Sequence, residues 1–260
     1  MTTLSSAPGG LAPRPGSAPR ARILAAQTRA EIVMTLRNGE QLLLTLVIPL
    51  LLLVGLSKLP SDVVGHDPAI DAVAPGIIAL AVISTAFTGQ AIATGFERRY
   101  GVLKLLGARP LGRSGLLVAK TLGVLAVEVV QIALVTAVAS ALGWHPVGNP
   151  AYAVLLVVLG TAAFSSLGLF LAGTLRAEAT LAVANGIYLL LIALGGVVIP
   201  ADRLPPAAEP VVSLLPSAAL GQGLRDVLLH GTGLPVHSVV VLLVWTALGG
   251  ILTARTFRWS

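Results

Sequence analysis

The stretch TGFERRYGVLKLLGARPLGRSG, residues 94–115, concentrates charge in a chain that carries little of it. Charged residues make up only 11 % of the sequence, and long apolar runs lie on both sides of this stretch. The fold therefore has to explain why charge gathers in one short connection. The charged residues in it are Glu97, Arg98, Arg99, Lys104, Arg109 and Arg113.

The overall composition indicates a membrane protein. Of the 260 residues, 55 % are hydrophobic, and the mean hydropathy is +0.91. Soluble domains carry about 25 % charged residues, whereas this chain has only 11 %. The net charge of +6 does not predict a nucleic-acid partner, because only 4 % of the residues are aromatic and the basic residues lie between apolar runs.

Several chemistries are excluded or unsupported. The sequence has no cysteine, which removes disulfides, thiolate catalysis and Cys-based metal sites, and its four histidines are scattered. We expect no cofactor or metal on this chain. Residues 1–20 are rich in Pro, Gly, Ser and Ala without an apolar core, which predicts a disordered tail and not a signal peptide.

The apolar runs predict six transmembrane helices, because a bilayer core needs about 20 apolar residues per helix. Both chain ends then lie on the same side. Of the 17 Lys and Arg residues, only Lys58, Arg203 and Arg225 fall on the opposite side, so the positive-inside rule places both termini and residues 94–115 in the cytoplasm. The predicted spans are residues 41–57, 72–95, 114–143, 151–175, 180–199 and 236–256.

Residues 21–39 predict a helix before the first span. Gln27, Glu31, Thr35 and Asn38 recur on one polar face, with apolar residues mainly on the other. This pattern suits a helix lying in the cytoplasmic interface, although a simple extension of the first span is also compatible with it.

Residues 96–107 predict an amphipathic helix that follows the second span. Gly107 is a plausible end and Pro110 prevents continuation. Leu105 is an apolar residue on the polar side of this helix. Either the positive charges only fix topology and contact anionic lipid, or the helix binds a cytoplasmic partner protein, which also explains Leu105.

The end of the charged stretch superficially resembles a phosphate-binding loop. Residues 107–114, GARPLGRS, depart from the G-x-x-x-x-G-K-[ST] pattern because Arg113 replaces the lysine and Pro110 interrupts the loop. No strand is expected before it. We therefore expect no ATP site on this chain.

Two segments resemble the ABC-2-type exporter permeases, the daunorubicin-resistance-like transmembrane subunits of ABC transporters. The first is FERRYGVLKLLGARPLGRSGLLVAK, with Glu97, Arg98, Gly101, Pro110 and Lys120 at matching places. The second is LGGVVIPADRLPPAAEPVVSLLPSAALGQGLRDVLLHG, similar to the family's exit from its fifth span. With the span count, the resemblance covers nearly the whole chain after about residue 20.

The resemblance implies a fold and a mode of action. It implies an all-α integral membrane protein, residues 21–260 forming one permease domain. This domain would have six transmembrane helices, an N-terminal interfacial helix, a cytoplasmic coupling helix at 96–107 and short re-entrant outer helices within 200–235. Two permeases, identical or paralogous, would pair in the lipid membrane and contact cytoplasmic ABC ATPase subunits, which bind ATP and Mg. The residues that would contact the ATPase are Glu97, Arg98, Arg99, Gly101, Leu103, Lys104, Leu105 and Leu106.

Polar residues inside the spans have two possible roles. A carboxylate at the bilayer centre is costly, so Glu128 should face protein or water. Glu128, with Gln131, Gln90 and Asn185, forms either a substrate path or hydrogen-bonded contacts between helices, for instance Glu128 with Asn185 or Gln90.

The leading hypothesis is a permease subunit of an ATP-driven exporter in the bacterial cytoplasmic membrane. Its cargo would be amphipathic or lipid-like: a drug, a lipid or a glycolipid. The chain itself would not be an enzyme. The alternative is an ATP-independent membrane protein, either a secondary transporter or an intramembrane enzyme. A secondary transporter would be expected to show matching broken helices, and an enzyme would need a second catalytic residue near Glu128.

Overall fold

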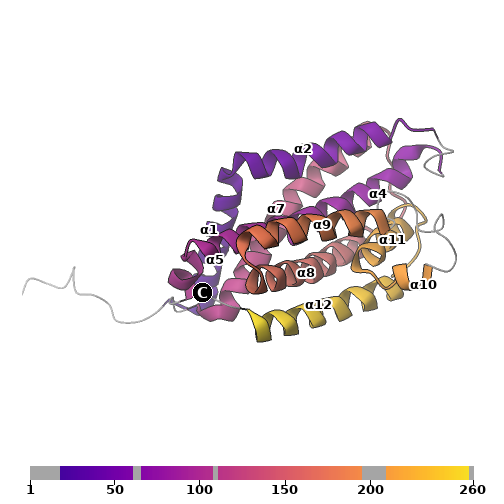
Figure 1. The fold of residues 1–260 in the computed structure, drawn as a ribbon. Coiled ribbons are helices and arrows are strands. Elements are labelled where there is room, and N and C mark those ends of the chain that lie inside the picture. Colours follow the sequence, from indigo (N-terminus) through magenta and orange to yellow (C-terminus); the bar gives the residue numbers. More distant parts are fainter. Residues whose placement is uncertain (1–17, 61–65, 108–110, 195–208, 258–260) are drawn as a thin grey trace, which may run out of the picture.

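The computed structural model describes residues 18–60, 66–107, 111–194 and 209–257, and these residues form helices without any strand. The expectations for the tail before residue 18, for Pro110 and for residues 195–208 lie outside this part. Figure 1 shows the helices gathered into one elongated bundle, with α1 across one end. The elements are α1 (Arg20–Arg37), α2 (Gly39–Leu56), α4 (Ala69–Val82), η1 (Ile83–Gly89), α5 (Gln90–Arg99), α6 (Val102–Gly107), α7 (Gly112–Ala141), α8 (Pro150–Thr174), α9 (Ala177–Leu194), α10 (Glu209–Val212), α11 (Pro216–Leu228) and α12 (Val236–Thr256).

In the part of the chain that the structure describes, four helices are long and apolar enough to cross a membrane. They correspond to the predicted second, third, fourth and sixth spans, and comprise Ala69–Arg99, Ser114–Ala141, Pro150–Thr174 and Val236–Thr256. The predicted first and fifth spans coincide with shorter apolar helices within the described residues, Thr45–Leu56 and Ala177–Ala193. The chain is therefore an all-α membrane protein, as predicted, while the count of six spans stays a prediction.

The second span starts earlier and ends later than the predicted 72–95. The segments α4, η1 and α5 follow one another without interruption, and η1 is a π-helix. Almost every residue of α4 and η1 is buried, so this helix forms the centre of the bundle. The ring of Phe87 meets that of Phe164 on α8 edge-on, with centroids 6.5 Å apart. Helices hydrophobic all round are expected in such central positions.

Helix α8 packs beside this centre and also against α11 and α12. Its start is defined locally: the Asn149 side chain accepts a hydrogen bond of 2.9 Å from the backbone N–H of Ala151, and Pro150 occupies the first helical position. Where α8 passes η1, Gly168 lets the two backbones approach closely. A glycine is required there because no side-chain atom fits between them.

The described residues between α9 and α12, 209–235, contain the short helices α10 and α11, where outer helices were expected within 200–235. Helix α11 has most of its residues buried and packs against α4, α8 and α12. Figure 1 places α10 and α11 at the end of the bundle opposite α1 and α5. Their position relative to a lipid leaflet stays a prediction.

Replacement of Gly168 should destabilise the bundle at the π-helix. A Cβ at Gly168 would lie 2.7 Å from the carbonyl oxygen of Phe87 and 3.2 Å from that of Ala86, both backbone atoms that cannot rotate away. We expect Gly168→Ala to cost about 1–3 kcal/mol, as overpacking does. The readout is the thermal unfolding midpoint of the purified chain in lipid nanodiscs.

Gly186→Ala is the matched control. Gly186 lies within helix α9, and an added Cβ would meet no heavy atom within 4 Å. Because alanine favours a helix by up to about 1 kcal/mol over glycine, this variant should keep or slightly raise the midpoint. Equal midpoints for the two variants would contradict the close approach of α8 to η1.

Candidate functional site

The segment predicted as one helix over 96–107 is two helices in the structure. Helix α5 ends at Arg99 and α6 begins at Val102, with Tyr100 and Gly101 between them. Gly101 has φ of +75°, a conformation that residues with a Cβ rarely adopt, so the chain turns here. The continuous-helix prediction is corrected accordingly, because a helical wheel contains no information about a backbone φ.

Helix α6 has one buried and one exposed side. Leu103 is buried, and α6 packs against α7. Leu105 is 74 % exposed, Lys104 is also exposed and Leu106 is half-buried. Tyr100, in the turn before α6, is likewise exposed. The exposed apolar residue on the polar side of this segment, inferred from the sequence, is therefore present.

Arg98 and Arg99, expected to contact a partner protein, have contacts within the chain. The Arg98 guanidinium donates hydrogen bonds to the carbonyl oxygens of Ala172 and Leu175, at 2.8 and 2.5 Å, where α8 ends. Cations near a helix C-terminus are favourable because the last carbonyls lack partners. Arg99 forms an exposed ion pair with Glu178 at the start of α9. Both arginines thus attach α5 to the turn between α8 and α9.

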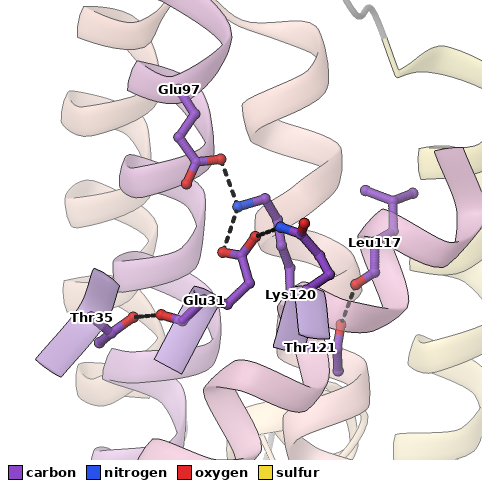
Figure 2. A network of polar contacts seen from close by, with 7 residues as sticks. Glu31, Thr35, Glu97, Leu117, Lys120 and Thr121 are labelled. Atoms are coloured by element: carbon purple, nitrogen blue, oxygen red, sulfur yellow. Dashed lines mark hydrogen bonds and ion pairs between the residues drawn. The ribbon is translucent and has the colours of Figure 1, made fainter. Parts of the chain in front are cut away.

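Glu97 is turned into the protein, where it meets the side chain of Lys120 on α7. The Lys120 ammonium lies 2.6 Å from Glu97 Oε2 and 3.0 Å from Glu31 Oε2 on α1. Figure 2 shows the two carboxylates converging on the lysine nitrogen from different helices. Gln27 donates a hydrogen bond of 2.8 Å to the other oxygen of Glu31. We call Glu31, Glu97 and Lys120 the ion triad.

The ion triad buries part of the polar face of the N-terminal helix. Gln27 and Glu31, on its polar face, are buried against α7, whereas Val33, Met34 and Leu36 are exposed. Its exposed apolar side chains can still face lipid, as in an interfacial helix, so the interfacial position stays a prediction. The polar stripe was visible in the sequence, but its partner, a lysine 89 residues away from Glu31, was not.

A cavity of about 260 Å³ lies beside the ion triad. Residues from α1, η1, α5, α6 and α7 line it, including all three members of the triad. Gln90 and Thr94 on α5 are further polar lining residues, and both are buried. Phe96 and Tyr100 add two aromatic rings to the lining.

The four polar residues predicted inside the spans do not form one path. Glu128 on α7 is fully buried and accepts a hydrogen bond from the Thr161 hydroxyl on α8. Gln131 contacts two other elements: its carbonyl accepts from Thr85 at 2.9 Å, and its amide N–H donates to the Thr45 carbonyl on α2. Contacts between helices are thus observed for both residues, with Thr161 in the place where Asn185 or Gln90 had been suggested for Glu128.

Asn185 and Gln90 differ from that pair. Asn185 is exposed on α9 and donates a hydrogen bond of 2.9 Å to the Leu181 carbonyl of its own helix. Gln90 lies in the lining of the cavity instead. Among the described residues, no group of three or more His, Cys, Asp or Glu side chains is placed to hold a metal ion.

Removal of the Lys120 charge should destabilise the α1–α5–α7 contact. Lys120→Gln would leave the buried carboxylate of Glu31 facing the partly buried one of Glu97, and breaking a buried pair typically costs about 3–5 kcal/mol. We expect a lower thermal unfolding midpoint in nanodiscs. Lys120→Gln combined with Glu31→Gln should lose less than the sum of the two single changes, because the residues interact.

Lys58→Gln is the control for this change. Lys58 is exposed after α2, and surface substitutions usually change the free energy of unfolding by no more than about 0.5 kcal/mol. A midpoint for Lys120→Gln equal to that of the Lys58 variant would show that the ion triad does not hold the three helices.

Comparison with protein families gives one match that covers most of the chain. Residues 24–229 match the family of ABC-2 type transporters. No curated protein matches the sequence significantly. The matched region includes α5, α6 and all three residues of the ion triad. The family consists of transmembrane permease domains that lack an ATPase site, which lies on a separate domain. The match therefore places the chain among ABC transporters and not among ATP-independent membrane proteins. The chain belongs to the ABC-2 type transporter family and is a multi-pass permease subunit, and its membership of this family implies an ATPase partner.

Proposed function

We propose that this chain is the permease of an ABC exporter that moves an amphipathic or lipid-like substrate, such as a drug, a lipid or a glycolipid, outward across the bacterial cytoplasmic membrane. ATP and Mg bind to the separate ATPase subunit, and hydrolysis there supplies the energy. Export as the direction rests on the resemblance of residues 96–120 and 194–231 to exporter permeases.

The ion triad is the observation that carries this proposal. A force applied by the ATPase to α6 is passed to α5 through the short turn at Gly101. Glu97, near the end of α5, is held to Lys120 on α7 and through it to Glu31 on α1. Movement of α6 therefore displaces three helices together, provided that the ATPase holds α6 in both of its states.

The surface of α6 offers the contact that an ATPase needs. Leu105 and Tyr100 present exposed apolar area beside the Lys104 charge. Aromatic residues surrounded by polar groups are typical of protein interfaces. Because Arg98 and Arg99 have contacts with α8 and α9, the ATPase contact centres on α6 and the turn before it.

The membrane arrangement follows from the same proposal. Both termini and α6 face the cytoplasm, α10 and α11 lie at the outer leaflet, and six helices cross the bilayer. Exposed apolar side chains on α7 and α12 face lipid or a second permease, identical or paralogous. In this proposal the permease chain itself catalyses no reaction.

Leu105→Asp should abolish transport without preventing membrane insertion. A carboxylate in place of the apolar side chain would be buried unpaired against the ATPase, and loss of an interface hot spot weakens binding by at least about 2 kcal/mol, roughly 30-fold. The measurements are co-purification of the ATPase and substrate-dependent ATP hydrolysis by the reconstituted complex.

Leu234→Asp is the control, since Leu234 is an exposed leucine in the segment between α11 and α12. It should leave ATPase binding unchanged. Wild-type coupling in the Leu105 variant would refute the assignment of α6 as the ATPase contact.

Single cysteines should report the proposed orientation, because the natural chain has none. In intact cells, a membrane-impermeant maleimide should label Leu234→Cys and spare Leu105→Cys, since only the outer side is accessible. Permeabilised cells should show labelling of both variants. Labelling of Leu105→Cys alone in intact cells would show that the topology is the reverse of the proposed one.

A further inference from the structure

The cavity beside the ion triad is large enough to hold a small organic group. Its volume of about 260 Å³ is on the order of eight times the volume of one water molecule in the liquid. Its lining comes from helices at the end of the bundle that carries α6, and Tyr100 on that lining is exposed. A ligand could therefore enter from the side that we assign to the cytoplasm.

The charged groups of the lining favour a cation. Among the described lining residues, the formal charges are the carboxylates of Glu31 and Glu97 and the ammonium of Lys120, which leaves one net negative charge. The Glu31 and Glu97 side chains, which carry the excess, are 10 % and 21 % exposed, so the excess charge is only partly solvated. A buried charge that is not compensated is costly, and a bound cation would offset it.

Two buried polar side chains of the lining have no hydrogen-bond partner among the described residues. They are Gln90, with both its amide nitrogen and its carbonyl oxygen, and the hydroxyl of Thr94. Gln90 is 5 % exposed and Thr94 is 1 % exposed. Buried polar groups are nearly always hydrogen-bonded, so these atoms indicate that something polar occupies the cavity. The carbonyl of Gln90 offers an acceptor and its amide nitrogen offers donors, so these atoms mark a polar ligand without fixing its charge.

The aromatic part of the lining has the same preference. The rings of Phe96 and Tyr100 are stacked, with centroids 6.3 Å apart and planes inclined by 26°. The faces of such rings attract cations, and quaternary ammonium groups are commonly recognised in this way. The carboxylate excess and the paired rings thus agree on a positively charged ligand.

We propose that this cavity binds an organic ammonium cation with apolar substituents, and that such a group is the polar end of the transported substrate. The transport role rests on the function proposed above. Binding itself does not, because the cavity is formed entirely by this chain. A binding measurement without the ATPase can therefore fail while coupling through α6 stands, and the reverse also holds.

The test compares two probes of equal shape on the full wild-type chain in lipid nanodiscs. Benzyltrimethylammonium carries the positive charge, and neopentylbenzene replaces its nitrogen by carbon. Each is titrated by saturation-transfer NMR, with empty nanodiscs subtracted. We expect saturable binding of the ammonium probe and at least about tenfold weaker binding of the neutral one, on the scale of one charge pair in a partly buried site.

Three variants then locate the site. Glu31→Gln and Glu97→Gln each remove the excess negative charge while leaving Lys120 one carboxylate, and each should weaken ammonium binding by about tenfold. Gln90→Leu should also weaken it. Glu178→Gln is the matched control, because it is the same change on an exposed carboxylate of α9 that does not line the cavity; its affinity should be that of the wild type.

Any of three results would overturn the proposal. These are equal binding of the charged and neutral probes to the wild type, absence of saturable ammonium binding, and equal loss in the Glu178 and Glu97 variants. The first two need no variant, so a folding defect in a substituted chain cannot rescue the proposal.

Discussion

One ammonium group organises the end of the bundle that carries α6. Lys120 is buried on α7 and is held by carboxylates from α1 and α5, segments that are far apart in the sequence. Each carboxylate compensates part of the cost of burying the lysine, and the lysine compensates the carboxylates. None of the three helices can shift alone without uncovering a charge. The polar face of α1 therefore has to turn inward, and the apolar side chains of α1 are left for the lipid or the interface.

The membrane-spanning part was predictable from sequence because the bilayer imposes a strict condition. Every backbone group in the hydrocarbon layer must be paired within its own segment, so length and hydropathy alone identify a spanning helix. The last span, Val236–Thr256, has the bounds read from the sequence. The second span extends beyond its predicted end because Glu97, Arg98 and Arg99 at the end of α5 have polar partners on other helices.

The details of the α5–α6 segment could not be predicted in the same way. Residues 96–107 have a continuous amphipathic pattern, yet Gly101 adopts a positive φ that periodicity does not report. Arg98 was read as a partner contact because its charge lies in a cytoplasmic loop. Its acceptors are carbonyl oxygens at the end of another helix, more than 70 residues away. Because every helix ends in unpaired carbonyl groups, the sequence does not indicate which of them accept these hydrogen bonds. Glu128 was found by its cost in a membrane, but its partner Thr161 is an inconspicuous residue in an apolar run.

The π-helix η1 sets the rotational phase between the two halves of the central helix. An α-helix turns by about 100° for each residue, so the additional residue in a π-helical turn reorients everything that follows. Thr85 within η1 donates a hydrogen bond to Gln131 and also lines the cavity, while Gln90 and Glu97 after η1 line the same cavity and Glu97 reaches Lys120. Loss of a single residue within 83–89 would restore a regular helix and rotate Glu97 away from its lysine. The length of this segment is consequently under a constraint that its apolar composition does not reveal.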